Sequence, residues 1–156
     1  MPNMTKRLFT HSTEFVVWAT KGKKWVFNYK ELKKINPEKQ KDGSQKQMRD
    51  VWSLPLVQGK ERLRDKNGRA LHPTQKPEEM LKRIIIASSN EDDLVLDPFL
   101  GSGTTILVAE QLKRDWIGIE INKKYVEAAK KRIKNYECHE VVCHEEGSFD
   151  NRTLKE

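Results

Sequence analysis

A glycine-rich stretch, D-P-F-L-G-S-G-T-T at 97–105, carries the residues best suited to chemistry in this chain. It follows an apolar run at 94–97 that predicts a strand, and it precedes a run that predicts a helix from about residue 104 to 113. Gly101 and Gly103 allow a tight turn and let a ligand approach the backbone without a Cβ in the way. Ligands of parallel α/β units bind at the carboxyl ends of the strands, where this loop and Asp97 would lie. The loop therefore predicts a cofactor site.

Glu120 ends the next predicted strand, 116–120, and narrows the choice of cofactor. A carboxylate at that position suits the two adjacent hydroxyls of a ribose. The loop lacks the Gly-Lys-Ser/Thr ending of a triphosphate site, and residue 106 is Ile where the dinucleotide pattern needs glycine. A nucleoside cofactor without a pyrophosphate fits better, and S-adenosylmethionine is the obvious one. The alternative is a glycine-bearing turn that binds nothing.

The elements that would position this loop alternate between helix and strand. Apolar periodicity predicts helices over 77–89 and 122–134, on either side of the strand–loop–helix–strand series. Such a β-α-β-α order indicates a parallel sheet with helices over it. Earlier in the chain, the β-branched and aromatic runs at 13–19 and 24–28 predict two strands joined as a hairpin around Gly22. Residues 30–70 predict a long, irregular, basic segment.

The charge of the chain is unevenly distributed. Residues 1–71 hold 17 Lys+Arg against 7 Asp+Glu, whereas residues 72–156 hold 13 against 16. A basic front half suggests a polyanionic partner, with a solvated lysine-rich surface as the alternative. The 36% hydrophobic content is lean for a self-sufficient α/β domain. The sequence contains no apolar run of membrane-spanning length and no signal segment, which predicts a cytoplasmic protein without membrane contact.

Several motifs occur together in a characteristic order. They are L-H-P-T-Q-K-P at 71–77, V-L-D-P-F-L-G-S-G-T-T at 95–105 and W-I-G-I-E-I at 116–121. In this order they resemble the β-group of exocyclic-amino (N6-adenine or N4-cytosine) DNA methyltransferases of restriction-modification systems. The front segments F-T-H-S-T-E-F-V-V-W-A at 9–19 and V-W-S-L-P at 51–55 agree, so the resemblance covers about residues 7–134.

The resemblance implies an α/β fold, specifically an incomplete Rossmann-like S-adenosylmethionine-dependent methyltransferase sheet with an irregular basic insertion. It divides the chain into a hairpin portion (1–29), a basic target-recognition region (30–70), a cofactor-binding β-α-β portion (71–135) and a polar tail (136–156). The residues that it implies for cofactor binding are His72, Pro73, Thr74, Gln75, Lys76, Asp97, Phe99, Gly101, Ser102, Gly103, Thr104 and Glu120. From the sequence around it alone, His72 would instead be a capping or packing histidine ahead of Pro77.

The family's catalytic motif is missing from the sequence. Amino methylation needs a short Asp, Ser or Asn–Pro–Pro–aromatic segment that binds the amino group and stacks on a flipped base. The near matches are D-P-F at 97–99, inside the cofactor loop, and N-P-E at 36–38, which lacks the aromatic. We therefore assign no catalytic residue. The chain looks like the C-terminal portion of such an enzyme, and strand 94–97 would be an unpaired edge.

Three functional accounts follow from the missing motif. The first is a split methyltransferase that modifies adenine N6 in duplex DNA, with cytosine N4 as the alternative target, and whose catalytic motif lies on a companion polypeptide. The second is a remnant that is inactive alone. The third is a non-catalytic module that binds DNA or cofactor.

Some smaller signals carry alternatives of their own. A zinc site is one interpretation of the pairs Cys138-His139 and Cys143-His144. Their spacing matches no common zinc finger, so no metal is predicted. The two cysteines give no disulfide framework. Trp25, Phe27 and Trp52 would pack in a core or stack on bases.

Overall fold

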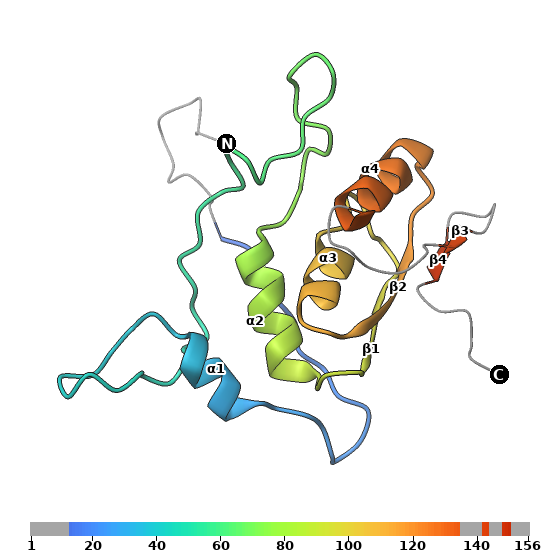
Figure 1. The fold of residues 1–156 in the computed structure, drawn as a ribbon. Coiled ribbons are helices and arrows are strands. Elements are labelled where there is room, and N and C mark those ends of the chain that lie inside the picture. The colour runs from blue at the N-terminus through green and yellow to red at the C-terminus, as the bar shows by residue number, and fades with distance from the viewer. Residues whose placement is uncertain (1–12, 135–141, 144–147, 151–156) are drawn as a thin grey trace, which may run out of the picture.

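A computed structural model describes residues 13–134, together with the backbone of residues 142–143 and 148–150. Its elements, in chain order, are α1 (Tyr29–Ile35), α2 (Glu78–Ser88), β1 (Leu94–Asp97), α3 (Thr104–Gln111), β2 (Asp115–Ile119), α4 (Lys123–Lys134), β3 (Val142–Cys143) and β4 (Ser148–Asp150) (Figure 1). None of the helices in the described part of the chain is long and apolar enough to cross a membrane.

The sheet has the strand order β1-β2-β4-β3. β1 and β2 are parallel, with a register that runs from Leu94 opposite Asp115 to Asp97 opposite Gly118. α3 is the crossover between them, as parallel neighbours require. β4 pairs antiparallel with β2, and β3 pairs antiparallel with β4. Within this sheet β1 therefore has a partner on one side only.

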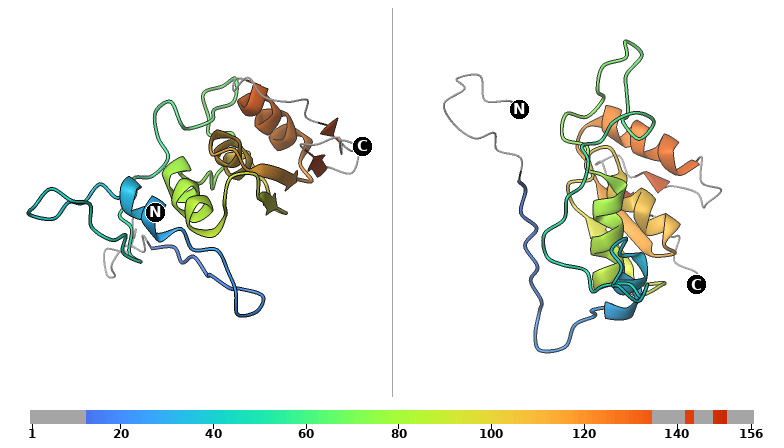
Figure 2. Two further views of the ribbon diagram at one scale, coloured as in Figure 1. Left: turned by 60° about the horizontal axis from the view of Figure 1, so that its bottom comes forward. Right: turned by 90° about the vertical axis from the view of Figure 1, so that its left-hand side faces the viewer.

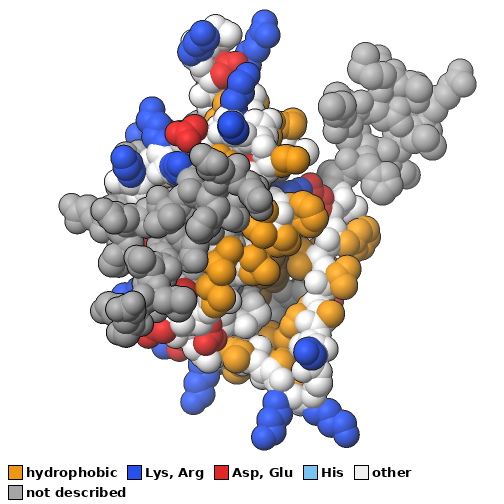
Figure 3. Space-filling view, turned by 90° about the vertical axis from the view of Figure 1, so that its right-hand side faces the viewer, with side chains coloured by type: hydrophobic (Ala, Val, Ile, Leu, Met, Phe, Trp, Pro, Cys, Tyr) orange, Lys and Arg blue, Asp and Glu red, His pale blue; other side chains and the backbone are white. Residues whose placement is uncertain are grey.

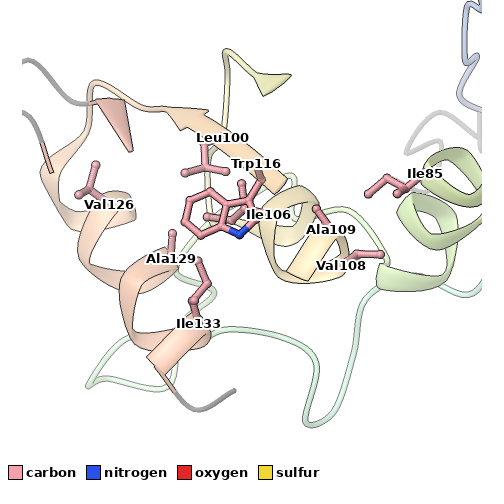
Figure 4. Packing of buried hydrophobic residues seen from close by; sticks show 9 residues of the cluster. All are labelled: Ile85, Leu100, Ile106, Val108, Ala109, Trp116, Val126, Ala129 and Ile133. Atoms are coloured by element: carbon pink, nitrogen blue, oxygen red, sulfur yellow. The ribbon is translucent and has the colours of Figure 1, made fainter. Parts of the chain in front are cut away.

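The helices form a single row on one face of the sheet. α3 packs against β1 and β2, α2 and α4 flank α3, and α1 packs on the far side of α2 (Figures 1 and 2). The core lies where α3 and α4 meet β2, and it is built around Trp116, Ile106 and Ile133, all at most 1% exposed (Figure 4). The indole N–H of Trp116 donates to Glu110 Oε2 (2.8 Å), so the buried ring has its one polar group satisfied.

The regular elements between residues 77 and 134 confirm the sequence prediction to within two residues at either end. α2, β1, α3, β2 and α4 correspond to the expected segments 77–89, 94–97, 104–113, 116–120 and 122–134. The apolar pair at 141–142 in the otherwise polar tail predicts a short stub of strand; β3 includes Val142, whereas β4 has no such signal in the sequence. Residue 141 lies outside the described residues.

The hairpin predicted at 13–28 is wrong, because neither run forms a strand. Residues 13–28 instead make an extended arm beside the body of the molecule (Figure 2, right). Ring contacts hold the two halves of this arm together: Trp18 stacks on Phe27 (centroids 5.3 Å apart) and meets Trp25 edge-on (6.5 Å). A strand needs backbone partners, and a lone two-stranded hairpin is marginal in water. The composition predicted the extended backbone, and the family resemblance implied that the missing catalytic segment would leave this hairpin without its neighbour.

α1 was missed because the basic segment around it looked irregular. Glu31 lies in its first turn and Lys33 and Lys34 in its last, which suits the helix dipole, and Leu32 is its buried anchor. Asn28 precedes α1 without capping it, because its side-chain amide donates to the carbonyls of Ile86 and Ser89 at the end of α2.

The remainder of the basic segment includes two short hairpin loops. The first hairpin loop is Glu38–Lys46, closed by a bridge between Lys39 and Gln45. The second hairpin loop is Leu63–Leu71, closed by a bridge between Arg64 and Ala70. Both project from the body as separate loops (Figure 1). The segment is therefore less irregular than its sequence suggests.

Among the described residues, the sheet face opposite the helices exposes apolar side chains. Leu94 and Leu96 on β1 are 61% and 58% exposed. The arm exposes more apolar side chains, namely Phe15, Val16, Val17, Trp18, Trp25 and Phe27. Figure 3 shows hydrophobic side chains gathered on the side of the molecule that carries the sheet. Monomeric proteins rarely leave such surfaces open.

Candidate cofactor site at the ends of β1 and β2

The glycine loop joins β1 to α3 in a conformation that only glycine adopts easily. Gly101 and Gly103 have φ values of +55° and +80°. A Cβ added to Gly103 would lie 2.6 Å from Ala129 Cβ on α4, so the loop and α4 are in direct backbone contact there. The Leu100 N–H donates to the carbonyl of Ile119 (2.9 Å), which fixes the loop against the end of β2. The loop is a rigid cradle rather than a flexible turn.

The two acidic residues predicted for the site lie at the carboxyl ends of the parallel strands. Glu120 accepts two backbone hydrogen bonds, from Gly101 N–H at Oε2 and from Asn122 N–H at Oε1 (both 2.8 Å). Asp97 Oδ1 accepts one from Phe99 N–H (3.0 Å). Each Glu120 oxygen keeps a second lone-pair direction for a ligand. The Glu120 carboxylate is thus oriented in advance to accept hydrogen bonds from a pair of hydroxyls.

His72 closes the site from the other side. A Cβ on Gly101 would come within 2.9 Å of His72 Nε2, so the imidazole lies directly against the loop backbone. The ring also meets Tyr125 of α4 edge-on, with centroids 4.6 Å apart. His72 Nδ1 is buried and has no hydrogen-bond partner among the described residues. Both proposed roles of this histidine, packing and site formation, are therefore compatible with its position.

The charges around His72 act in opposite directions on its titration. Burial lowers the pKa of the imidazole, the Glu120 carboxylate raises it, and the cations Arg62 and Lys76 lower it further. The net pKa lies below the ordinary value for histidine. The neutral ring is therefore favoured beside the loop in the folded protein.

The rest of the 72–76 segment is divided between surface and interior. Pro73 and Thr74 are exposed, whereas Gln75 is only 6% exposed and uses its amide within the chain. The Lys76 ammonium forms an exposed ion pair with Glu14 of the arm (2.6 Å). Exposed pairs of this kind contribute about 0–1 kcal/mol, so a ligand carboxylate could displace Glu14 at small cost.

Arg132 of α4 is a site residue that the sequence did not reveal. Its guanidinium donates to the Ser102 carbonyl and the Thr104 hydroxyl (both 3.1 Å) and pairs with Glu78 Oε1 (2.8 Å). The side chain is 9% exposed. Burial lowers the pKa of this guanidinium, and Glu78 opposes that effect. Ser102 and Thr104 are themselves buried, so these two predicted residues shape the loop from within.

Two exposed apolar side chains border the carboxylates. Phe99 follows β1 and is 89% exposed, and Ile121 follows β2 and is 94% exposed. A flat apolar ring would find contact surface there, beside the polar groups of Glu120. Ile121 had not been singled out from the sequence, although an apolar residue directly after a strand-terminal acid would have been the available signal.

A large cavity of about 1290 Å³ lies next to this site but does not contain it. Its walls are the arm at 14–18, the segment 48–59, the segment 73–77 and α2. Asp97, Glu120 and the glycine loop are not among its lining residues. The 73–77 segment, which directly follows His72 in the chain, belongs to the lining of this cavity.

No metal site is present in the part of the chain whose side chains are described. No group of three or more His, Cys, Asp or Glu is placed to hold an ion among those residues. The possible zinc cluster formed by Cys138, His139, Cys143 and His144 lies outside the residues whose side chains are described.

Comparisons with known proteins agree with this geometry. A family model described as DNA methylase matches residues 1–131. The chain is 46% identical over 136 residues to the type II methyltransferase M.HinfI of Haemophilus influenzae. The matched region covers 86% of this chain and 36% of that protein. It is 48% identical over 135 residues to the type II methyltransferase M2.LlaDCHI of Lactococcus lactis subsp. cremoris, covering 85% and 46%.

A solved structure shares the fold as well as the sequence. The crystal structure of the M1.HpyAVI–SAM complex superposes with a TM-score of 0.56 at 38% identity, over 85% of this chain and 55% of that chain. This agreement supports the α/β assignment and the incomplete Rossmann-like sheet. The chain spans about half, or less, of the length of the proteins it matches.

Replacing Arg132 with Met should lower the free energy of unfolding by about 2–3 kcal/mol, because two buried acceptors and Glu78 lose their donor. Urea denaturation followed by circular dichroism would measure the change. Lys131→Met is the matched control: the neighbouring side chain is exposed on the same helix and should change stability by less than about 0.5 kcal/mol. Equal effects of the two variants would contradict the bridging role of Arg132.

The lowered pKa of His72 predicts a pH dependence with a definite sign. The unfolded chain binds a proton at this residue near pH 6.5, whereas the folded chain does so only at lower pH. The contribution of His72 to stability should be complete above about pH 6.5 and fall as the pH drops toward the folded pKa. The stability difference between wild type and His72→Gln should therefore shift against the wild type between about pH 7.5 and pH 5, measured by urea denaturation. A difference that is constant over this range would show that His72 does not titrate differently on folding.

Proposed function

The chain belongs to the DNA methylase family, and on that premise we propose that it is the cofactor-binding and target-recognition portion of a site-specific DNA methyltransferase. The reaction is methyl transfer from S-adenosylmethionine to adenine N6 of a base flipped out of duplex DNA. The observation that carries this proposal is the pre-oriented Glu120 carboxylate beside a rigid glycine loop at the ends of two parallel strands. The proposed region boundaries are those of the sequence: 1–29, 30–70, 71–135 and 136–156.

The described residues fit S-adenosylmethionine in chemistry as well as position. Glu120 would accept the two ribose hydroxyls, and Phe99 and Ile121 would contact the adenine ring. Lys76 would attract the carboxylate of the methionine end. The cofactor supplies an activated methyl group, and the protein's part is to bind and orient it. The proposed cofactor-binding set is His72, Pro73, Thr74, Gln75, Lys76, Asp97, Phe99, Gly101, Ser102, Gly103, Thr104 and Glu120.

The members of this set have different roles. Asp97, Phe99 and Glu120 lie at the carboxyl ends of the strands, and His72 lies against the glycine loop. The Lys76 ammonium, now paired with Glu14 of the arm, would turn to the cofactor carboxylate. Gly101 and Gly103 provide backbone room for the cofactor. Ser102 and Thr104 hold the loop in shape through Arg132, and Gln75 has its amide bound inside the chain. The contribution of these last three is thus to geometry.

The proposed target is adenine N6, with cytosine N4 as the alternative. Adenine N6 is preferred over cytosine N4 because adenine is the commoner target in the family that the motifs resemble. The residues that would distinguish the two bases belong to the catalytic motif, which residues 1–156 do not contain. The basic segment 30–70 would contact phosphates and position the duplex.

The uncovered apolar surfaces support a companion polypeptide segment that carries the catalytic motif. β1 lacks a neighbour on its outer edge within the described sheet, and Leu94 and Leu96 on its open face are exposed. A strand paired with β1 would satisfy that edge, cover this face and bring a catalytic motif beside the cofactor loop. Such a segment would also give the aromatic arm at 13–28 a surface to pack against.

Glu120→Ala should weaken S-adenosylmethionine binding at least about tenfold, because two hydrogen-bond acceptors for the ribose are lost. Isothermal titration calorimetry with the full chain would measure the dissociation constant. The control is Glu127→Ala, an exposed carboxylate on α4 that faces away from the loop and should leave binding unchanged. Unchanged affinity in Glu120→Ala would overturn the cofactor-site assignment.

The companion segment makes a prediction about activity. The chain alone should transfer no labelled methyl group from S-adenosylmethionine to plasmid DNA. Addition of a separately expressed polypeptide with the part of M.HinfI that this chain does not cover should restore transfer, and nucleoside mass spectrometry should then detect N6-methyladenine. N4-methylcytosine in the digest would correct the target base. Methylation by the chain alone would refute the argument from the missing motif.

A further inference from the structure

We infer that the second hairpin loop, Leu63–Leu71, is the element that docks DNA phosphates beside the cofactor site, and that Gln75 is the positioning residue that fixes this loop. The inference rests on the proposed function and deepens it, because it divides the basic segment 30–70 into parts with different roles. It also gives Gln75 a task other than contact with the cofactor.

Gln75 joins the base of the second hairpin loop to the segment that borders the cofactor site. Its side-chain amide donates to the Glu61 carbonyl (2.7 Å), and its side-chain oxygen accepts from the Leu63 N–H (3.0 Å). The side chain is buried, so these bonds are shielded from water and strong. Arg62 adds a further bond, from its guanidinium to the Pro73 carbonyl (3.2 Å). The entrance and exit of the loop are therefore clamped to one another.

The loop itself is stiff. Asp65 Oδ1 accepts hydrogen bonds from the N–H groups of Asn67 (2.8 Å) and Arg69 (2.9 Å), and the Arg64 guanidinium donates to the Gly68 carbonyl (2.7 Å). Gly68 has a φ of +76°, the left-handed conformation that such a turn requires. A stiff loop presents its charges at fixed positions, which lowers the entropy lost on binding.

Two cations on this loop are available to a polyanion. Lys66 and Arg69 are exposed, and neither forms an ion pair with any residue that the structure describes. Asp65, which lies next to Lys66 in the sequence, directs its carboxylate to backbone N–H groups of the loop and not to these two cations. DNA phosphates are the partner that matches two exposed cations on a hydrogen-bonded loop next to the proposed site for base chemistry.

The position of the loop separates it from the first hairpin loop. The second loop is tied to the start of α2, where Glu61 Oε1 accepts from the Glu78 N–H (2.7 Å). Glu78 also pairs with Arg132, which holds the glycine loop. The second hairpin loop, the start of α2 and the cofactor loop are thus connected by consecutive hydrogen bonds.

The first hairpin loop is attached at the other end of α2. It follows α1, and α1 is fixed through Asn28, whose N–H donates to the carbonyl of Ala87 (3.0 Å) near the end of α2. α2 has 11 residues, which corresponds to a length of about 16 Å. Figure 1 shows the two loops leaving the body in different directions. The first loop therefore lies well away from the point where a flipped base would meet the methyl donor.

The separation matters because base flipping demands accurate registration. A flipped nucleotide stays covalently joined to its flanking phosphates, so holding those phosphates determines where the base arrives. Contacts made by a stiff loop that is hydrogen-bonded to the cofactor site transmit this register. Contacts made from the far end of α2 would add affinity for DNA without determining where the flipped base arrives.

The test compares equal losses of charge on the two loops in the full chain. Lys66→Ala/Arg69→Ala and the control Lys39→Ala/Lys41→Ala each remove two exposed cations from a hairpin loop. Binding of a mixed-sequence duplex would be followed by fluorescence anisotropy over a series of salt concentrations. The second-loop variant should lose roughly tenfold in affinity, and its slope of log affinity against log salt should fall by about 2. The loss of DNA affinity in the control variant should be smaller than this by a factor of at least about three.

Gln75→Ala tests the clamp without any change of charge. It should weaken DNA binding severalfold, and by a larger factor than it weakens S-adenosylmethionine binding measured by calorimetry. Gln75→Glu, which keeps the acceptor for Leu63 N–H, should fall between Gln75→Ala and wild type. A loss of cofactor affinity without a loss of DNA affinity would overturn the positioning role.

The outcomes separate this inference from the proposed function. Absence of salt-dependent DNA binding in the wild type would refute duplex DNA as the partner, and the inference with it. If the wild type binds DNA but the two charge variants lose affinity equally, or the control loses more, the role of the second loop is refuted while the proposed function stands.

Discussion

The candidate cofactor site depends on the guanidinium of Arg132, whose side chain is 9% exposed. A cation withdrawn from water is unstable by several kcal/mol unless acceptors surround it, so its position is fixed wherever those acceptors converge. Here they come from the glycine loop, through Ser102 and Thr104, and from the start of α2, through Glu78. α4 contributes the arginine itself. One side chain thereby fixes the relative position of three segments that are far apart in the sequence, and the close approach of Gly103 to Ala129 follows from the same arrangement.

The sequence was most informative where elements find their partners close by in the chain. β1 and β2 pair with one another across a short crossover, so their apolar runs and the intervening helix could be predicted from local periodicity. The glycine loop and Glu120 followed from that topology. The arm at 13–28 has the same strand-like composition but lacks a pairing partner in the described structure, and its backbone stays extended without a ladder. Composition favours extended backbone, but a strand forms only where a neighbouring strand supplies hydrogen-bond partners.

The residues that the sequence could not assign act through contacts distant in the chain. Arg132 lies on a helix with several other basic residues, and nothing in its local sequence distinguishes it from exposed Lys131. Gln75 lies inside a motif that suggested cofactor contact, whereas its amide bonds to Leu63 and Glu61, 12 and 14 residues earlier in the chain. α1 is short, and its placement depends on Asn28 reaching the end of α2. In each case the deciding interaction joins residues that are distant in the chain, so it cannot be predicted from the local periodicity and spacing of the sequence.

α2 links these features into one rigid body. Its start is hydrogen-bonded to Glu61 at the base of the second hairpin loop and paired with Arg132 behind the glycine loop. Its end receives Asn28 and, through it, α1 and the first hairpin loop. A helix has a fixed rise per residue, so the distance between the two basic loops is set by its length rather than by the flexibility of the segment between them. The proposed function would need such a fixed distance, because an error of about 1 Å at the reacting atoms is costly in rate. If the basic segment binds DNA as proposed, the position of its two hairpin loops would be set by α2, although its own sequence resembles an irregular insertion.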